Sequence, residues 1–399
     1  MCGTAAPKAA ASTSRLEVSD ILREFAPSPS LLTAEQARVV RDLIDCRTEA
    51  FGGNIHQCVN CGHRQVVYNS CGNRHCPKCR SLTQARWLEA QQKHLLPVEY
   101  FHVVFTVPKP LHSLFLADRK VAYNLLFEAV AETLQEVALN PKRLGAKIGF
   151  VAVLHTWTQT LLFHPHIHCI VPGGGISTDG PKWVSCKPGY LFPFKVLSEV
   201  FRGKLLAKFE KAVQQRTIHF DQTQATALLQ EAACQNWQVY AKPPSAGPQQ
   251  VLEYLGRYTH RIAISNHRLV SLHNGKVTFR YTDRKNGNKQ KTMTLSADEF
   301  VRRFLLHLLP RRFVKIRHYG LLANAVREKN LTLCRQLLAE LGLTAQLLQP
   351  ADSWQQLLCR LTGKDVTLCP RCHIGTLVII ETLPRPRRKW SLPGRATSP

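Results

Sequence analysis

The sequence predicts an α+β protein, in which an antiparallel sheet is flanked by helices and preceded by a small cysteine-rich module. The first observation is the order β, α, β, β of the segments within residues 101–171, which builds an antiparallel sheet backed by helices. The second is a group of closely spaced cysteines in residues 51–80, which is typical of a metal-binding loop. Composition and apolar spacing place the four segments at residues 101–107, 114–139, 148–162 and 166–171.

Further elements flank this sheet. Residues 16–50 are predicted to be helical, with Thr33 and Gln36 placed as a capping box. Asn274-Gly275 and Asn286-Gly287 predict hairpin turns within residues 268–295, and the basic segment 311–319 is predicted to be a strand or loop. Other helices are expected over residues 195–216, 223–240, 249–260, 298–309 and 321–348.

The charge balance indicates a polyanionic partner. Lysine and arginine total 53 against 27 acidic residues, a formal net charge of +26, and nucleic acid is the partner that this excess favours. No stretch reaches the roughly 18 apolar residues of a membrane-spanning helix, so no membrane partner is expected. Residues 1–14 lack the continuous apolar core of a secretory signal. We therefore expect a cytoplasmic protein.

A chain of 399 residues is expected to contain two or three domains with additional segments. The predicted division is a helical arm (1–50), a cysteine-rich module (51–97), a central sheet domain (98–320), a helical C-terminal region with one CxxC pair (321–383) and a basic, disordered tail (384–399).

Two cysteine pairs predict a zinc site. Cys58-Val-Asn-Cys61 and Cys76-Pro-Lys-Cys79 are separated by 14 residues, close to the zinc-ribbon pattern in which two knuckles hold one tetrahedral Zn²⁺. Since thiols stay reduced in the cytosol, metal ligation explains the cysteines better than disulfides. The choice of four ligands stays open and a second ion is compatible with the composition, because the same loop also contains Cys71, His75, His56 and His63.

A third pair, Cys369-Pro-Arg-Cys372, lies near the C-terminus. One CxxC pair alone is weak evidence of a metal site. It either completes a site with Cys359 or His373 or forms a turn, and both interpretations stay open.

The most informative segment is His164-Pro-His166-Ile-His168, which follows an apolar run. Side chains two residues apart share one face of a strand, so the three imidazoles are expected to point into one volume while the apolar residues between and after them face the core. A single histidine in a strand is usually a hydrogen-bonded core or rim residue. Three on one face indicate a divalent metal site, because imidazole is the commonest metal ligand.

Tyr254 and Tyr258 are spaced i, i+4, so a helix would present both hydroxyls on one face. Such pairs are packing residues in most proteins, but here the same chain holds the histidine strand, the large positive charge and the flanking Arg257 and Arg261. A tyrosyl hydroxyl attacks a phosphodiester when a cation polarises the phosphate. The resulting phosphotyrosine conserves the bond energy, so a strand can be rejoined without ATP, in agreement with the absence of a GxxxxGK[ST] loop.

A second basic segment suits contact with nucleic acid. It interleaves cationic and aromatic residues, which contact the backbone and the bases respectively. The expected DNA-contacting side chains are Arg257, Arg261, Arg311, Arg312, Lys315 and Arg317.

These motifs resemble one known family. His166-Ile-His168 is similar to the HUH motif, in which U is a hydrophobic residue, and Tyr254-x3-Tyr258 resembles the tyrosine pair of the two-tyrosine HUH transposases of rolling-circle insertion sequences, the insertion-sequence ninety-one family. The strings 254–266 and 317–320 and the cysteine-rich element that ends Asn73-Arg-His-Cys76-Pro-Lys-Cys79 are similar to that family as well. The resemblance covers most of residues 20–330, and its motifs stand in the family's order.

The resemblance implies an HUH-nuclease sheet in residues 98–320 and a bacterial, nucleoid-associated transposase acting on single-stranded insertion-sequence ends and target DNA. It implies that His166 and His168 hold Mg²⁺ or Mn²⁺, that Tyr254 and Tyr258 are alternate nucleophiles, and that each nick leaves a 5′-phosphotyrosine and a free 3′-OH. It also implies a zinc module of Cys58, Cys61, Cys76 and Cys79 that helps to bind DNA.

The third ligand of the catalytic metal does not carry over from the family. Gln159 is the ligand that we expect, with His155, His164 and His260 as alternatives. Two imidazoles alone bind the hard Mg²⁺ poorly, so Mn²⁺ should compete well.

Other functions fit parts of the sequence. Replication initiators and relaxases use the same HUH and tyrosine chemistry, but the zinc module and the lack of a helicase domain favour a transposase. A zinc-dependent DNA-binding protein without catalysis would use the histidines structurally and pack the tyrosines, and metal-dependent nicking of a single strand separates it from an enzyme. A metallohydrolase of small substrates finds no HExxH motif or carboxylate pair.

Overall fold

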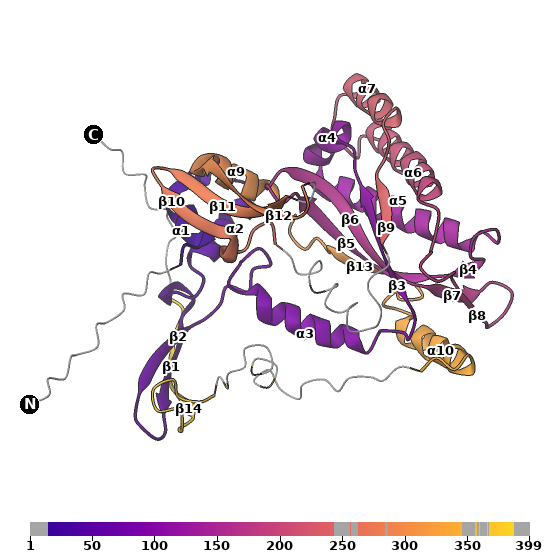
Figure 1. Cartoon of the computed structure of the whole chain (residues 1–399). Helices are drawn as coiled ribbons and strands as arrows, with labels where there is room; N and C mark the ends of the chain where they lie inside the picture. Colours follow the sequence, from indigo (N-terminus) through magenta and orange to yellow (C-terminus); the bar gives the residue numbers. More distant parts are fainter. Residues whose placement is uncertain are drawn as a thin grey trace, which may run out of the picture.

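The histidine-bearing strand lies in the middle of a five-stranded antiparallel sheet, with strand order β13-β5-β6-β3-β9 (Figure 1). The computed structural model describes residues 15–242, 256, 262–283, 286–344, 356, 359, 365 and 367–386. Within that part of the chain, the antiparallel sheet with flanking helices confirms the predicted α+β class. The strands are β3 (Tyr100–Thr106), β5 (Gly149–Trp157), β6 (Phe163–Pro172), β9 (Val239–Lys242) and β13 (Ile316–Gly320).

One face of this sheet forms the main core. Alternate residues of β3 and β6, among them Phe105, Ile167 and Cys169, pack against the buried sides of α5 and α6, as the strand period requires. The remaining alternate residues, including His166 and His168, therefore face the other side. The helices that gather on the core side in Figure 1 are α4 (His112–Ala117), α5 (Arg119–Leu139), α6 (Phe194–Gln214) and α7 (Gln222–Ala233).

Two predicted helices differ from the structure in this region. The helix expected over residues 114–139 is divided at Asp118, whose backbone is extended and whose side chain accepts a hydrogen bond from the backbone N–H of Val121 at the start of α5. The helix expected over 223–240 ends at Ala233, and residues 239–242 instead pair with β3 and form the edge strand β9. The short apolar run around Val239 fits either element, and the open edge of the sheet selects the strand.

The opposite face of the sheet is partly covered by two helices. Leu88 of α3 (Arg80–Gln92) packs with Tyr100 and Ile170, and α10 (Arg327–Glu340) packs against Val151 and Val153. A small sheet of order β4-β7-β8 extends from the end of β6. Its strands are β4 (Ala146–Lys147), β7 (Gly174–Ser177) and β8 (Trp183–Ser185).

A second core joins the N-terminal helices to the hairpins after the tyrosine segment. Thr33 and Gln36 form the predicted capping box at the start of α2. Asn274 and Gly275 have φ of 48° and 66°, as a type I′ hairpin turn requires. The packed elements are α1 (Val18–Phe25), α2 (Ala34–Ile44), β10 (Leu269–His273), β11 (Lys276–Asp283), β12 (Lys289–Ser296) and α9 (Ala297–Leu306).

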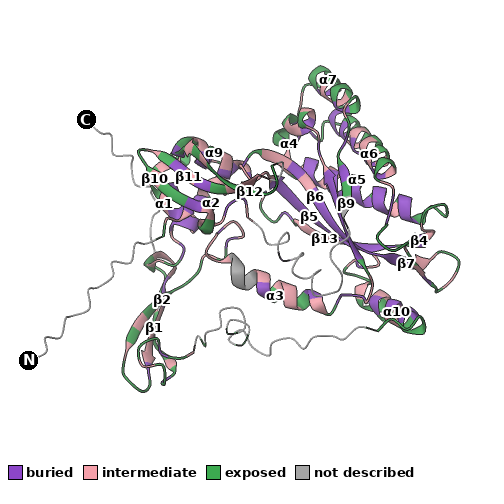
Figure 2. Ribbon diagram, viewed as in Figure 1, coloured by how far each residue is buried: buried purple, intermediate pink, exposed green. Residues whose placement is uncertain are grey.

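A third sheet joins the two ends of the chain, in the order β14-β1-β2. The strands are β1 (Gly53–Cys58), β2 (Arg64–Tyr68) and β14 (Leu377–Leu383). This differs from the expected helical C-terminal region 321–383: α10 is a helix within it, but β14 is a strand paired with β1. Figure 2 shows that this sheet is mostly exposed or half-buried, unlike the central sheet.

Short 3-10 helices connect these elements at Pro29–Leu31, Glu49–Phe51, Lys109–Leu111 and Asn266–Arg268. None of the described helices is long and apolar enough to cross a membrane. The predicted tail, residues 384–399, lies outside the described residues beyond position 386.

His307 makes the stability of the fold depend on pH. Its side chain is buried, with Nδ1 accepting from the Thr156 hydroxyl at 3.2 Å and Nε2 donating to the Leu161 carbonyl at 3.0 Å. Burial lowers the pKa of His307 to about 4 from its ordinary value of 6.5. The unfolded chain therefore binds this proton more readily, so the stability present above pH 6.5 is lost as the pH falls toward 4.

We expect His307 alone to reduce the free energy of unfolding by about 2 kcal/mol between pH 7 and pH 5. Urea denaturation of the wild type and of His307→Gln at both pH values measures this, because the glutamine amide keeps a donor but does not titrate. The wild type should lose more stability on acidification than the variant. Equal losses in the two proteins would contradict the assignment.

Candidate active site

Three histidines converge on the open face of the central sheet. His155 of β5 and His166 and His168 of β6 place one ring nitrogen each within 4.8 Å of the others. The strand register explains this, since His155 lies directly opposite His166 in the antiparallel pair β5–β6. His155 and His168 are buried and His166 is half-buried, so the cluster is open to ligands from the His166 side.

Hydrogen bonds fix which ring nitrogens face the cluster. His166 Nδ1 lies 2.7 Å from the backbone carbonyl of His164. A carbonyl only accepts, so Nδ1 carries the proton and Nε2 of the neutral ring is the ligand atom. His168 Nδ1 lies 2.7 Å from Nε2 of the buried His102 on β3. His102 therefore orients the His168 ring as a positioning residue, in the way that outer partners orient metal-binding histidines.

The cluster opens into a cavity of about 290 Å³. His164 and Gln159 line it, and so does Tyr240 of β9. The expectation that His164, His166 and His168 share one face is thus confirmed, but the third side chain of the close group is His155. Gln159 lies at the rim, where its backbone carbonyl accepts a hydrogen bond from Arg268.

Both predicted nucleophiles lie within residues 249–261, and of these the structure describes only Gly256. Tyr254, Tyr258, Arg257, Arg261 and His260 lie outside the described residues. The Gly256 carbonyl accepts a hydrogen bond from Gln84 Nε2 of α3 at 2.5 Å, and a Cβ at this position would meet Leu88 Cδ1 at 2.8 Å. Leu88 in turn packs on Ile170, which lies two residues after His168 on the same strand. Gly256, two residues from each tyrosine, is thus held on the helix that covers the histidine face.

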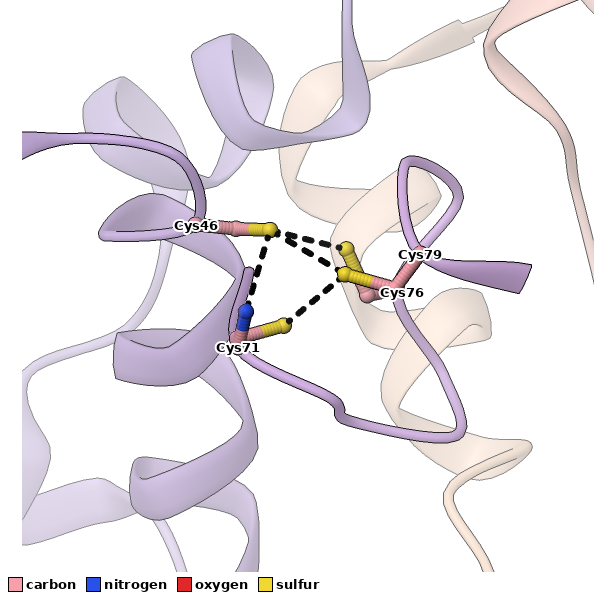
Figure 3. A group of neighbouring side chains, drawn as sticks. All are labelled: Cys46, Cys71, Cys76 and Cys79. Carbon is pink, nitrogen blue, oxygen red and sulfur yellow. Dashed lines mark hydrogen bonds between the residues drawn. The ribbon is translucent and has the colours of Figure 1, made fainter. Parts of the chain in front are cut away.

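The first cysteine cluster consists of Cys46, Cys71, Cys76 and Cys79 (Figure 3). Cys46 Sγ lies 3.3 Å from Cys79 Sγ and 3.5 Å from Cys76 Sγ, and Cys71 Sγ lies 3.7 Å from Cys79 Sγ. Four sulfurs at about 2.3 Å from a tetrahedral Zn²⁺ lie about 3.8 Å apart, so this spacing suits one zinc ion. It is too long for a disulfide, whose S–S bond is about 2.05 Å.

The structure separates the two cysteine pairs whose spacing predicted a single zinc ion. Cys76 and Cys79 lie just before α3 and pack with the second core, whereas Cys58 ends β1 and Cys61 lies in the turn between β1 and β2. The second close group is Cys58, Cys61, Cys369 and Cys372.

The two other ligand candidates of the cysteine loop have different outcomes in the structure. Cys71 joins the first cluster, but His75 is in neither close group, and its Nε2 accepts a hydrogen bond from the backbone of Leu309 at 3.3 Å. Cys46 was not predicted as a ligand, because it belongs to no CxxC pair. The only signal was its place directly after an amphipathic helix, 25 residues before Cys71.

Comparison with known proteins identifies the family. Residues 149–330 match the family described as "Putative transposase", and residues 18–107 match the one described as "Transposase zinc-binding domain". "Putative transposase y4qJ" of Sinorhizobium fredii (strain NBRC 101917 / NGR234) is 47% identical over 378 residues, which cover 92% of this chain and 95% of the relative. The chain belongs to the two-tyrosine HUH transposases of the insertion-sequence ninety-one family.

Two more distant similarities were also found. "Transposase for insertion sequence element IS801" of Pseudomonas savastanoi pv. phaseolicola is 28% identical over 307 residues, covering 73% of this chain and 71% of the relative. Among solved structures, a conjugative relaxase TrwC bound to oriT DNA is 12% identical with a TM-score of 0.24, over 41% of this chain and 74% of that chain.

Most of the site residues of the transposase lie within the two matched regions. The histidine triad and Gly256 lie within the matched residues 149–330, and all four cysteines of the first cluster lie within residues 18–107. Cys58 and Cys61 lie within the zinc-binding region too, but Cys369 and Cys372 lie outside both matches.

The cations of the basic segment of the transposase are either exposed or half-buried. Arg311 and Arg312 are exposed. Lys315 is half-buried and lines a small cavity with Arg74. The Arg317 guanidinium lies 4.1 Å from the centre of the Phe127 ring and donates to Asn124 Oδ1 at 2.5 Å. Arg317 is thus half-buried and already has partners within the fold, and Arg311 and Arg312 are the exposed pair.

Proposed function

We propose that this transposase nicks and rejoins single-stranded DNA at the ends of an insertion sequence through a 5′-phosphotyrosine intermediate, in a rolling-circle-like mechanism. The observation that carries the proposal is the histidine triad. Three imidazoles from two neighbouring strands converge at an open cavity, with the orientation of two of them fixed by hydrogen bonds. A purely structural histidine has no need of such an arrangement around open space.

The donor set suits a divalent cation. His155, His166 and His168 would hold it, and three neutral nitrogen donors favour Mn²⁺ over the harder Mg²⁺. The bound cation would polarise a phosphate and stabilise the charge that develops on it. The histidines fix its position, and His102 keeps the His168 ring in the required orientation.

The proposed reaction balances without a nucleotide cofactor. The hydroxyl oxygen of one tyrosine, Tyr254 or Tyr258, attacks the scissile phosphorus, the bond from phosphorus to the 3′-oxygen breaks, and the 3′-oxygen leaves with a proton. In the reverse sense, a 3′-OH attacks the phosphotyrosine, forms a new phosphodiester and releases the tyrosine. The position of Gly256 beside α3 supports a nucleophile segment on the histidine side of the sheet.

Incubation of the purified full-length protein with end-labelled single-stranded oligonucleotides and Mn²⁺ tests the proposal. We expect a covalent protein–DNA adduct that resists denaturation, together with a released strand that ends in a 3′-OH. EDTA should abolish both products and added Mn²⁺ should restore them. Tight DNA binding with no adduct under any metal condition would instead support the non-catalytic DNA-binding protein.

The affinity for single-stranded DNA should fall steeply with salt. Neutralised phosphates release counterions, so the slope is expected to be roughly 0.7 log units per contact for each tenfold increase in salt. If the exposed Arg311 and Arg312 contact phosphates, Arg311→Gln/Arg312→Gln should reduce that slope by about 1.4. Fluorescence anisotropy across a salt series measures it. Arg302→Gln is the control, because Arg302 is exposed but already paired with Glu299, and an equal change in both variants would contradict the assignment.

A further inference from the structure

The exposed sheet brings together cysteines from the two ends of the chain. Cys58 Sγ lies 3.6 Å from Cys372 Sγ, and Cys61 Sγ lies 3.7 Å from Cys369 Sγ. All four sulfurs lie within 4.8 Å of one another. As in the first cluster, these distances fit four thiolates around one tetrahedral Zn²⁺ and not a disulfide. We propose that Cys58, Cys61, Cys369 and Cys372 form a second zinc site, which fastens the C-terminal segment to the N-terminal module.

The two CxxC pairs have the same local conformation. In each, the backbone N–H of the fourth residue after the first cysteine donates to that cysteine's carbonyl, Gly62 to Cys58 at 3.1 Å and His373 to Cys369 at 2.9 Å. Gly62 and His373 both have left-handed backbone conformations, with φ of 68° and 58°. His373, which lacks the freedom of glycine, pays a steric cost for adopting it. The matched geometry is that of two equivalent metal-binding knuckles facing each other.

Backbone N–H groups also point at the sulfurs. Asn60 donates to Cys58 Sγ and Arg371 donates to Cys369 Sγ, each at 3.4 Å, and Gly375 donates to Cys372 Sγ at 3.4 Å. Such bonds stabilise negative charge on sulfur, which is the form in which cysteine binds a metal.

Gly375 allows the two knuckles to approach. A Cβ at Gly375 would lie 2.5 Å from Cys58 Sγ and 2.6 Å from Asn60 Cβ. Both distances are shorter than any stable contact, and neither neighbour is the end of a long flexible side chain. The position next to the sulfurs is therefore compatible with glycine alone.

The sheet has no apolar core that would hold it together instead. None of the described residues of β1, β2 and β14 belongs to a buried hydrophobic cluster. Apolar side chains such as Val66 and Ile379 are 48% and 59% exposed. A three-stranded sheet of this size needs another source of stability, and a structural zinc ion supplies folding free energy directly.

The site has a consequence for the whole chain. Cys61 and Cys369 are 308 positions apart, so one ion would close a loop that contains the entire histidine-bearing sheet. Zinc would thereby hold β14 on β1, and damage to the N-terminal pair would release the C-terminal strand. The inference does not depend on strand cleavage, since it concerns metal content and sheet pairing only.

Metal analysis of purified full-length protein tests the site. We expect about two Zn²⁺ per chain in the wild type and about one in Cys369→Ser/Cys372→Ser. Cys234→Ser/Cys359→Ser is the matched control, because it also removes two thiols, both of them exposed and outside the clusters among the described residues. The control should keep about two ions. One ion in the wild type, or an unchanged content in Cys369→Ser/Cys372→Ser, would overturn the proposal.

A second measurement avoids variants that fold poorly at the C-terminal end. In hydrogen exchange of the full-length protein, Cys58→Ser should deprotect the amides of Leu377–Leu383, more than 300 residues away, and leave those of Phe163–Pro172 protected. Alkylation of the native wild type should label Cys234 rapidly and Cys58 and Cys372 only after a chelator is added. Immediate labelling of Cys58 and Cys372, or unchanged protection of β14 in Cys58→Ser, would exclude a metal at this site.

Discussion

Replacing His166 or His168 with alanine is expected to reduce metal-dependent cleavage of single-stranded DNA at least about 100-fold, since loss of even an outer partner of a metal ligand costs roughly 10- to 100-fold. Each variant removes one of three converging ligand nitrogens. The fold and most of the DNA affinity should remain, because the core side of β6 and the basic surface are unchanged. Adduct formation with labelled oligonucleotides at several Mn²⁺ concentrations measures the loss, and anisotropy measures the binding.

His164→Ala is the matched control for this loss. His164 lies on the same strand and lines the same cavity, but it is outside the close group, and the carbonyl that holds His166 is part of the backbone. It should therefore keep activity within a few-fold of the wild type. Near-normal cleavage by His166→Ala or His168→Ala would exclude the metal assignment, and so would an equal loss in His164→Ala.

The same assay decides the third ligand. His155→Ala should resemble His166→Ala, whereas Gln159→Ala should retain most of its activity, because the described contact of Gln159 runs through its backbone carbonyl. The reverse result would indicate that Gln159, and not His155, is the third metal ligand. Raising the Mn²⁺ concentration should partly rescue His155→Ala if its defect is weakened metal binding.

Local sequence signals predicted the central sheet. The alternation in β6 specified which face carries histidine and which carries Ile167 and Cys169, and Asn274-Gly275 predicted its hairpin turn correctly. The edge strand β9 was missed because its short apolar run is compatible with helix or strand until the edge of β3 is available for pairing. Similarly, β14 depends on pairing with β1, more than 300 residues earlier, and no local pattern contains that information.

In the candidate sites, too, local sequence signals predicted the residues of one segment but not their partners from distant segments. His166 and His168 belong to one strand, so their period alone brings them together, but His155 joins them through the register of a second strand. The CxxC spacing identified Cys58, Cys61, Cys76 and Cys79 as a set of candidate ligands. The spacing did not specify which cysteines share an ion. That depends on the tertiary positions of Cys46, which follows α2, and of Cys369 and Cys372, which precede β14. Residues that are neighbours in sequence were thus assigned to one ion, although tertiary pairing places them in two clusters.

The two tyrosines are expected to act in sequence, so Tyr254→Phe and Tyr258→Phe should each retain some nicking but lose complete strand transfer. In this mechanism the first tyrosine cleaves the donor strand and the second accepts the strand when it is passed on, which the i, i+4 spacing allows if both hydroxyls reach one metal. If a single nucleophile sufficed, one variant would be silent and the other inactive. Nicking and joining assays on oligonucleotides that carry both a donor end and a target separate these cases.

Matched controls make the tyrosine prediction specific. Phenylalanine keeps the ring and its packing, so loss of stability is a minor effect, and Tyr254→Phe/Tyr258→Phe should form no adduct at all. Tyr240→Phe is the control, since Tyr240 is the described tyrosine that lines the histidine cavity, and it should transfer strands normally. Peptide mapping of the adduct should find DNA on Tyr254 or Tyr258. Full transfer by both single variants would contradict sequential use of the two tyrosines. An adduct on Tyr240, Tyr281 or Tyr319 would show that neither Tyr254 nor Tyr258 supplies the oxygen that bonds to phosphorus.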